Sequence, residues 1–295
     1  MEPRVTVLVP CCREPEALLR AALDSLVRQT VTDWRAILID DAPHDGGYQR
    51  IVASYADPRL SYCRNPGAHG IAPAWNFGVG RVDTEFFSFL HADDELEPDY
   101  LETMLALAND RPDASLYACG ATVIDGRGRA YLPLGDAVKR LIAPRGAVSV
   151  LEGAPALTRL LVGNFLFCPT FLYRTAKVGT RLFDGRYRFV LDLAYSSGVL
   201  LDGGRIVLTK HAAYRYRRLA ASGTQQYTAS GSRFDEELQI GHALAREAQR
   251  RGLRAAALAG HASLTVRLHI LLRIAAALYA RDWKLLRANA LRLVR

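Results

Sequence analysis

The sequence has 295 residues, of which 50% are hydrophobic, and its 38 basic and 30 acidic side chains give a formal net charge of +8. This composition excludes a disordered chain and is enough for one large domain, or for a domain with an extension. A disulfide framework and a zinc site are not expected, because no C-x-x-C pair occurs among Cys11, Cys12, Cys63, Cys119 and Cys168. A reducing cytoplasmic compartment is the natural location.

Short apolar segments alternate with amphipathic segments over the first half of the chain. Such alternation with short joints predicts a Rossmann-like, mainly parallel α/β sheet with helices on both faces. The predicted strands are residues 5–9, 36–39, 60–63 and 86–90. The predicted helices cover residues 18–27 and 49–55, and further helices begin near residues 72 and 98.

Acidic side chains follow three of these predicted strands. Glu14 comes soon after the first strand, Asp40 and Asp41 directly after the second, and Asp93 and Asp94 after the fourth. Ligands of such sheets bind beyond the carboxyl ends of the strands, so we expect these side chains to converge on one rim.

Each acidic pair has two interpretations at this point. Asp93 and Asp94 are hard oxygen ligands suited to Mg²⁺ or Mn²⁺ with a bound phosphate, or they favour the positive N-terminus of the helix that follows. Asp40 and Asp41 are ligand-binding carboxylates, or they cap a turn.

The second half of the chain is less regular. The pattern predicts strands at 115–124, 171–173 and 205–216, a loop at 133–155, a helix at 189–201, and helices for most of the chain after residue 233. Asp192 lies among apolar neighbours in the predicted helix 189–201. It is either paired at the edge of the core or a general base, because burial raises the proton affinity of a carboxylate.

Several common site motifs are missing from the sequence. No G-x-G-x-x-G follows the first strand, and no G-x-x-x-x-G-K-[ST], G-x-S-x-G or H-x-x-x-H occurs. A conventional dinucleotide site, a P-loop nucleotide site, a serine hydrolase elbow and a paired-histidine zinc site are therefore not expected. Carboxylate chemistry remains.

Two long stretches contain an ordered series of motifs. They read VTVLVPCCREPEALLRAALDSLVRQTVTDWRAILIDDAPHDG and NPGAHGIAPAWNFGVGRVDTEFFSFLHADDELEPDYLE. Both resemble the family 2 glycosyltransferases, which have the GT-A fold, use nucleotide-sugar donors and invert the configuration of the transferred sugar. The resemblance extends over roughly residues 5–224.

The resemblance implies a role for particular residues. In the family the loop after the first strand contacts the nucleobase, and Pro10, Cys11 and Glu14 stand in that loop, while Asp41 matches a base-binding carboxylate. Asp93 corresponds to a ribose and metal ligand, Asp94 to the main metal ligand, and Asp192 to the catalytic base. The chain departs from the family pattern at Cys11, Cys12, Arg13, His91, Leu191 and Leu219.

The implied function is metal-assisted transfer of a sugar, with Mn²⁺ or Mg²⁺ as cofactor. The donor would be a UDP-, GDP- or dTDP-sugar, and the acceptor a hydroxyl of a glycan or lipid-linked molecule in cell-surface polysaccharide assembly. A nucleotidyltransferase is one alternative, because it shares a nucleotide fold with an acidic metal pair. A catalytically decayed protein that binds glycans or nucleotides is the other, because His91, Leu191 and Leu219 replace family residues.

The expected organisation is a GT-A domain over residues 1–228, with a nucleotide half to about 125 and an acceptor half from 126, followed by a basic helical extension over residues 229–295. Residues 233–295 hold 12 basic and 5 acidic side chains, or +7 of the net charge. The extension docks on the inner membrane face, or it packs against the domain or a second subunit of a homodimer. No nucleic-acid partner is expected.

The chain is expected to be soluble or peripheral at the membrane. The N-terminus lacks the apolar core of a signal peptide, and the longest apolar run near the C-terminus, residues 274–280, is too short to span a bilayer.

Overall fold

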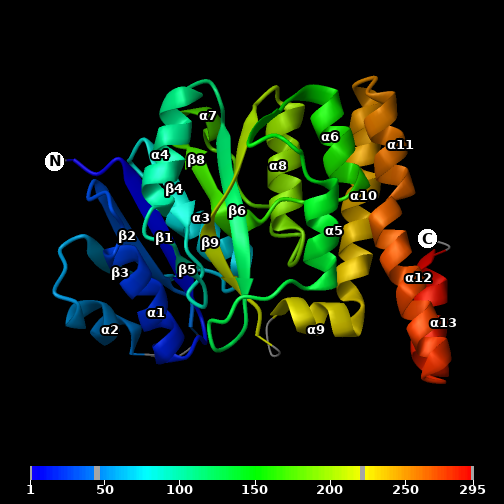
Figure 1. Cartoon of the computed structure of the whole chain (residues 1–295), viewed down its shortest axis with the longest axis horizontal. Helices are drawn as coiled ribbons and strands as arrows, with labels where there is room; N and C mark the ends of the chain where they lie inside the picture. The colour runs from blue at the N-terminus through cyan, green and yellow to red at the C-terminus, as the bar shows by residue number, and fades with distance from the viewer. Residues whose placement is uncertain (1, 43–46, 220–222, 294–295) are drawn as a thin grey trace.

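The computed structural model describes residues 2–42, 47–219 and 223–293. Its centre is a nine-stranded sheet with the order β3-β2-β1-β4-β8-β6-β9-β5, and β7 pairs with β9 (Figure 1). The strands are β1 (Val5–Cys11), β2 (Trp34–Asp40), β3 (Leu60–Arg64), β4 (Phe86–Phe89), β5 (Glu95–Leu96), β6 (Leu116–Ile124), β7 (Val148–Leu151), β8 (Phe171–Arg174) and β9 (Ile206–Arg217).

The N-terminal half of the sheet is parallel, as the alternating pattern predicts. β1 pairs in parallel with β2 and β4, and β2 pairs in parallel with β3. The second half is mixed: β8 runs antiparallel to β4 and β6, while β9 is parallel to β6 and antiparallel to β5 and β7. The predicted α/β fold with helices around the sheet is confirmed.

Helices cover both faces of the sheet (Figure 1). Their bounds are α1 (Glu16–Val27), α2 (Tyr48–Ser54), α3 (Ile71–Val79), α4 (Tyr100–Asp110), α5 (Leu134–Ile142), α6 (Gly153–Val162), α7 (Thr175–Val178), α8 (Leu191–Leu201), α9 (Gly223–Ser230), α10 (Ser232–Arg250), α11 (Arg254–Ala262), α12 (Leu264–Tyr279) and α13 (Trp283–Leu293). A short 3₁₀ turn covers Cys168–Thr170.

The alternation of side chains along the strands divides the core into two layers. Val5, Val7 and Val9 of β1 face the cluster that contains α1 and α4. Leu8, between them, faces the cluster formed by α3, α6, α8, α10 and α11. Both faces of β1 are therefore buried, which explains why its sequence is a continuous apolar run.

The expectation of a loop over residues 133–155 is wrong. This stretch contains α5, the edge strand β7 and the start of α6. Val138 and Leu141 of α5 are exposed, as are Val148 and Val150 of β7. Val138, Leu141 and Ile142 recur at helical spacing, so α5 is an amphipathic helix whose apolar face is partly exposed.

The C-terminal helices are attached to the domain in two different ways. α10 and α11 contribute Ile240, Leu244 and Ala257 to the second core cluster. The two helices approach closely at a glycine pair: a Cβ added at Gly260 would lie 2.7 Å from the carbonyl oxygen of Gly241. The proposed boundary between residues 228 and 229 falls inside α9, so the division of the chain stays a prediction.

The helices α12 and α13 form a hairpin at one end of the molecule (Figure 1). A small cluster built on Phe234, Leu238 and Ile270 joins α12 to α10, and an ion pair of 3.0 Å between Arg292 and Asp235 joins α13 to α10. Many apolar side chains of the hairpin remain exposed: Leu264, Leu268, Leu271, Leu272, Leu278, Tyr279, Trp283 and Leu291.

The helical stretch Arg254–Tyr279, which comprises α11 and α12, is long and apolar enough to cross a membrane by length and composition alone, and 17% of its most apolar window is buried. The prediction from the sequence concerned uninterrupted apolar runs, and isolated arginines such as Arg267 divide this stretch into short runs. The stretch is also two helices, which are separated at Ser263. The core helix of a soluble protein meets the same criterion, so this finding by itself does not place the chain in a membrane.

Candidate functional site

The carboxyl ends of β2, β1 and β4 lie side by side at one edge of the sheet. Cys11 at the end of β1 is opposite Asp40 at the end of β2. On the other side of β1, the Leu90 amide after β4 donates to the Leu8 carbonyl. The three acidic strand ends therefore converge on one rim, as the sequence predicts.

The loop after β1 is closed by its own glutamate. The backbone amides of Cys12 and Arg13 donate to Glu14 Oε2 at 2.6 and 3.0 Å. Cys11 is buried, and Pro10 precedes it as the sixth residue of the strand. Pro10, Cys11 and Glu14 thus lie at the rim, with the glutamate turned back onto the loop backbone.

Asp41 holds the segment that leads into α3. Its Oδ1 accepts from the Asn65 side-chain amide at 2.7 Å and lies 3.2 Å from His69 Nδ1, and its Oδ2 accepts from the Gly70 amide at 2.8 Å. Asp41 is 5% exposed. The predicted base-binding carboxylate is therefore tied to residues 65–70, and Asn65 and His69 are rim residues that the sequence pattern does not predict.

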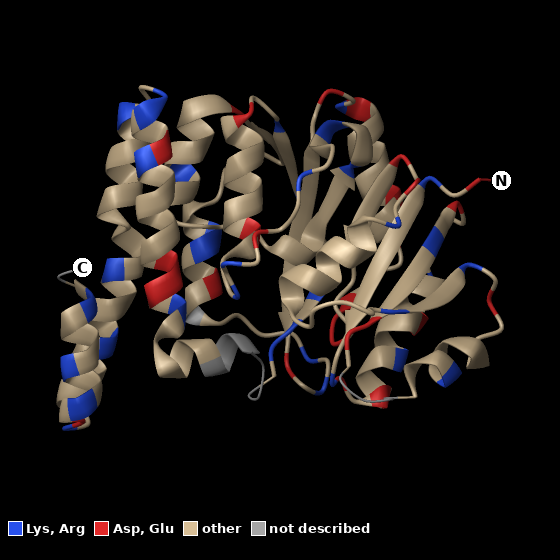
Figure 2. Cartoon of the chain, turned by 180° about the vertical axis from the view of Figure 1, so that it is seen from behind, with Lys and Arg blue, Asp and Glu red and all other residues tan. Residues whose placement is uncertain are grey.

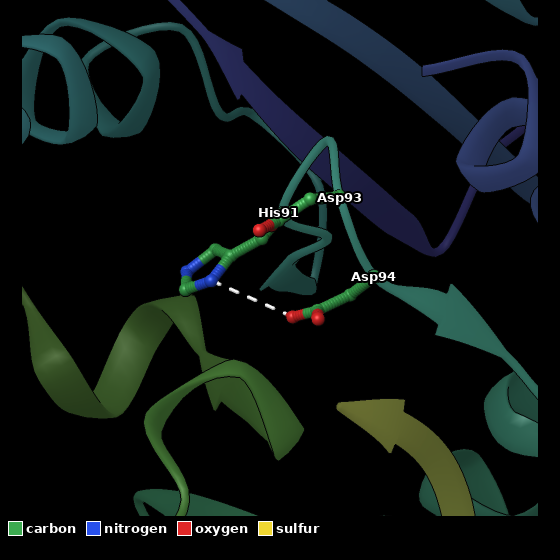
Figure 3. Close-up of side chains that lie close together, drawn as sticks. All are labelled: His91, Asp93 and Asp94. Atoms are coloured by element: carbon green, nitrogen blue, oxygen red, sulfur yellow. Dashed lines mark ion pairs between the residues drawn. The ribbon is translucent and has the colours of Figure 1, made fainter. Parts of the chain in front are cut away.

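His91, Asp93 and Asp94 form a compact group in the turn after β4 (Figure 3). Their ligand atoms all lie within 4.8 Å of one another. His91 Nδ1 is 3.6 Å from Asp94 Oδ2. Burial lowers the pKa of His91 to about 4, so its imidazole is neutral near pH 7.

Asp94 is anchored to β9. Its Oδ2 accepts from the Tyr214 hydroxyl at 2.9 Å, and its Oδ1 accepts from the Arg217 amide at 2.7 Å. The side chain is 1% exposed. Burial, with the nearby charge of Asp93, raises the pKa of Asp94 well above its ordinary value, and the two hydrogen bonds oppose this rise. Neither Tyr214 nor Arg217 carries a signal in the sequence that marks it for this contact.

Asp93 has a more open environment. Its side chain is partly exposed, and within the described residues no donor from another residue binds its carboxylate. The Arg217 guanidinium instead binds the Asp93 backbone carbonyl, with Nε at 2.7 Å from the oxygen. Burial raises the pKa of Asp93, and the charge of Arg217 opposes the rise.

The donor set of this group fits a hard divalent cation. One or two carboxylates are the ligands that Mg²⁺ usually takes from proteins, and carboxylate oxygens suit Mn²⁺ as well. Asp93 has free lone pairs, and each oxygen of Asp94 keeps one lone pair beyond its hydrogen bond. Asp93 and Asp94 are therefore the residues that would hold the metal.

Asp192 lies in the first turn of α8. Its Oδ2 accepts from the Asn164 side-chain amide at 3.3 Å, and Asn164 Oδ1 accepts from the Leu166 amide at 3.1 Å. Burial raises the pKa of Asp192, while the charge of Lys139 on α5 and the Asn164 hydrogen bond oppose the rise. Neither Asn164 nor Lys139 was assigned a role from the sequence.

Comparison with known proteins identifies a family model and several relatives of this chain. A family model described as Glycosyl transferase family 2 matches residues 6–149. An uncharacterised glycosyltransferase of Rickettsia typhi is 28% identical over 64% of this chain and 56% of its own length. The putative glycosyltransferase EpsH of Bacillus subtilis is 33% identical over 38% of this chain and 32% of its own length. The chain thus spans about half of the length of the first relative and about a third of the length of the second.

Solved structures match over a longer part of the chain. S. aureus TarS, in a crystal structure with UDP-GlcNAc, covers 90% of this chain with a TM-score of 0.66 and 18% identity, and 73% of that chain is matched. The mannosyltransferase PcManGT of Pyrobaculum calidifontis, solved with GDP-Man and Mn²⁺, covers the whole chain with a TM-score of 0.62 and 15% identity, and 86% of that chain is matched. At these identities the likeness concerns the fold, and it confirms the predicted GT-A architecture.

Proposed function

Because residues 6–149 belong to glycosyl transferase family 2, we propose that the chain is an inverting glycosyltransferase. It moves a sugar from a nucleoside-diphosphate-sugar to a hydroxyl of a glycan or lipid-linked acceptor. The observation that carries the proposal is the grouping of His91, Asp93 and Asp94 within 4.8 Å after β4, inside the matched family segment and at the ligand-binding rim of the sheet.

The rim residues bind the donor. Asp93 faces the ligand with free lone pairs, and Asp94 is held from behind by Tyr214 and Arg217. Bound at this pair, Mn²⁺ or Mg²⁺ would neutralise the charge that grows on the departing nucleoside diphosphate. Two proteins of the same fold have been solved with UDP-GlcNAc and with GDP-Man and Mn²⁺, which supports a nucleotide-sugar donor.

The nucleoside part of the donor lies against the ends of β1 and β2. The backbone of Pro10 and Cys11 forms part of this surface. Glu14 and Asp41 hold the two loops around it in place. Because both carboxylates already accept hydrogen bonds from backbone amides, their main contribution is to fix the conformation of these two loops.

Asp192 acts as the general base. It takes the proton of the acceptor hydroxyl while that oxygen attacks the anomeric carbon from the side opposite the diphosphate. The new C–O bond forms as the bond to the leaving phosphate oxygen breaks, so configuration inverts in one displacement without an enzyme nucleophile. The hydrogen bond from Asn164 orients the carboxylate for this step.

The proposal is tested by product analysis. The full chain is incubated with Mn²⁺ and a panel of UDP-, GDP- and dTDP-sugars, first screened by thermal shift, and the released product is identified. Release of nucleoside diphosphate that depends on Asp93 supports sugar transfer. Release of pyrophosphate identifies a nucleotidyltransferase. Binding without turnover, with every donor and with added glycan acceptors, identifies a decayed binding protein.

We further propose that the α12–α13 hairpin docks on an anionic lipid surface, where a lipid-linked acceptor is found. Figure 2 shows blue basic positions along both helices at this end of the molecule. Arg281, Lys284 and Arg287 are exposed beside the exposed rings of Tyr279 and Trp283. Aromatic rings flanked by cations are typical of the membrane interface, and each cation near an anionic surface contributes about 1 kcal/mol.

Vesicle flotation of the full chain tests this docking. We expect binding to vesicles that contain phosphatidylglycerol, and loss of binding when Arg281, Lys284 and Arg287 are all changed to Glu. Truncation at Arg254 is unsuitable, since α11 is part of the core. Equal binding to neutral phosphatidylcholine vesicles contradicts the charge argument. A dimer in solution that the same substitutions break would identify the hairpin as a contact between two copies.

A further inference from the structure

The segment that leads into α8 is bonded to a glutamate of α10. Glu236 Oε2 accepts hydrogen bonds from the backbone amides of Phe189 at 2.7 Å and Arg188 at 2.9 Å, and its Oε1 lies 3.1 Å from the same Arg188 amide. The helix begins at Leu191, and the proposed base Asp192 is its second residue. The Glu236 carboxylate therefore binds the backbone three and four residues before the base.

The helix α8 has no capping side chain of its own. Its N-cap residue is Val190, which makes no side-chain hydrogen bond to the first turn. Serine, threonine, aspartate and asparagine usually stand at this position because they can accept such a bond, and valine cannot. The direction in which α8 begins therefore depends on the segment before it, which Glu236 fixes. A negative charge near the N-terminus of a helix is also favourable.

Glu236 differs from the acidic residues beside it on α10. Asp235 pairs with Arg292 at 3.0 Å, and Glu237 pairs with Arg233 at 2.9 Å. Within the described part of the chain, Glu236 has no arginine or lysine partner, and its carboxylate, which is partly buried, binds backbone amides instead. Hydrogen bonds to an ionised carboxylate are stronger than neutral ones, so this contact is suited to hold a segment in place.

The geometry points to Glu236 as a positioning residue that fixes the first turn of α8 and, with it, the Asp192 carboxylate. Arg233, one turn earlier on the same side of α10, supports this contact, because its guanidinium carbon lies 4.7 Å from the ring centroid of Phe189. The inference rests on the proposed function for its catalytic consequence, whereas the anchoring is a property of the folded chain alone. Because Glu236 follows residue 228, the predicted basic extension would supply part of the acceptor side of the site.

The anchoring is tested without turnover, by hydrogen exchange of the full chain resolved to single amides by NMR. Glu236→Ala should raise the exchange rates of the Arg188 and Phe189 amides about tenfold or more, since both lose their acceptor. The amides of β1 should keep their rates. Glu236→Gln should restore the protection, because its carbonyl oxygen can take the place of Oε2 and accept from both amides. Unchanged rates at both amides, or an equal rise throughout the chain, would overturn the inference.

Gln239→Ala is the matched control. Gln239 is exposed on the same helix, one turn after Glu236. Its removal should change neither the exchange rates nor the kinetics. The same effects in this variant would show that α10 is loosened as a whole, and would reject a specific role for Glu236.

Kinetics then connect the anchoring to the base. Glu236→Ala should reduce kcat by about 10–100-fold, the scale of a misplaced catalytic group, with KM for the donor within about twofold of wild type. Glu236→Gln should recover kcat to within about threefold. A loss shared equally by kcat and donor affinity, or a Gln variant as impaired as the Ala variant, rejects the inference. If the two amides lose protection but no chain, wild type included, transfers sugar, the proposed function fails and the anchoring of α8 stands.

Discussion

The two acidic regions of the molecule are built in opposite ways. At the rim, Asp94 is buried against β9 and accepts hydrogen bonds from a tyrosine and a backbone amide. On α8, Asp192 accepts one longer hydrogen bond from Asn164 and feels the charge of a lysine. A metal ligand must be held rigidly, whereas a base must be free to accept a proton. The difference therefore matches the two proposed tasks.

The largest expected effect is a loss of transfer activity without a loss of donor binding, on replacement of Asp192. Asp192→Asn should reduce transfer by about 10²–10⁴-fold, the range for a positioned acid–base group, because the amide cannot accept the proton. Donor binding, measured by thermal shift with nucleoside diphosphate and Mn²⁺, should be unchanged, since the rim is intact. Asp202→Asn, an exposed carboxylate at the other end of α8, serves as the control. Retained turnover would reject Asp192 as the base.

Stability should distinguish the two aspartates of the rim. Asp94→Ala leaves the Tyr214 hydroxyl and the Arg217 amide without their acceptor, and two such losses should reduce the free energy of unfolding by about 2–4 kcal/mol. Asp93→Ala removes no such contact and should cost less than about 1 kcal/mol. Urea unfolding of both variants measures the difference. Equal losses would show that Asp94 has no special anchoring role.

The pH dependence of transfer should report the environment of Asp192. Its pKa is raised, and the ionised form is the active one, so kcat/KM should fall as the pH is lowered through a midpoint above the ordinary aspartate value of about 3.9. Rate measurements from pH 4.5 to 8 with saturating metal check this. Parallel measurement of donor affinity removes any contribution from the rim. A flat profile down to pH 4.5 would contradict a raised midpoint.

The smallest effect concerns Asn164. Its side-chain amide makes one hydrogen bond of 3.3 Å to Asp192, and a bond to a charged group contributes about 1.5–3 kcal/mol when well formed. For this longer bond we expect Asn164→Ala to reduce kcat by about tenfold or less, with KM for the donor unchanged. Asn164→Asp, which puts a second negative charge beside Asp192, should reduce kcat further than Asn164→Ala does. A change confined to donor KM would place Asn164 on the donor side instead.

The rim was predictable because local signals determine it. A continuous apolar run predicts a buried parallel strand, and the rule that ligands bind at carboxyl ends brings Asp41, Asp93 and Asp94 together without knowledge of the packing. The partners of Asp94 were not predictable in the same way. Tyr214 and Arg217 reach it from β9, more than a hundred residues away, through an antiparallel pairing that the sequence pattern does not encode.

The residues around Asp192 were predicted less well from the sequence than those of the rim. The sequence pattern predicts a loop over residues 133–155, where the structure has α5, so it gives no position for Lys139. A signal was present: Pro133 precedes the helix, Asp136 is in its first turn, and Lys139 and Arg140 are in its last turn. This is the charge order that favours a helix. What the sequence cannot give is the contact of that helix with Phe167, which depends on tertiary packing.

The glycine pair that joins α10 and α11 has a consequence for the route of the two substrates. Because Gly241 and Gly260 let α10 and α11 approach closely, α11 stays with the core, and in the proposed docking α12 and α13 are the helices that would meet the bilayer. That hairpin lies at the opposite end of the long axis from β2 and β3 (Figure 1). If the hairpin is bound to the bilayer, the water-soluble donor would approach from the β2–β3 end of the molecule, which faces the cytoplasm. The lipid-linked acceptor would approach from the end that carries the hairpin.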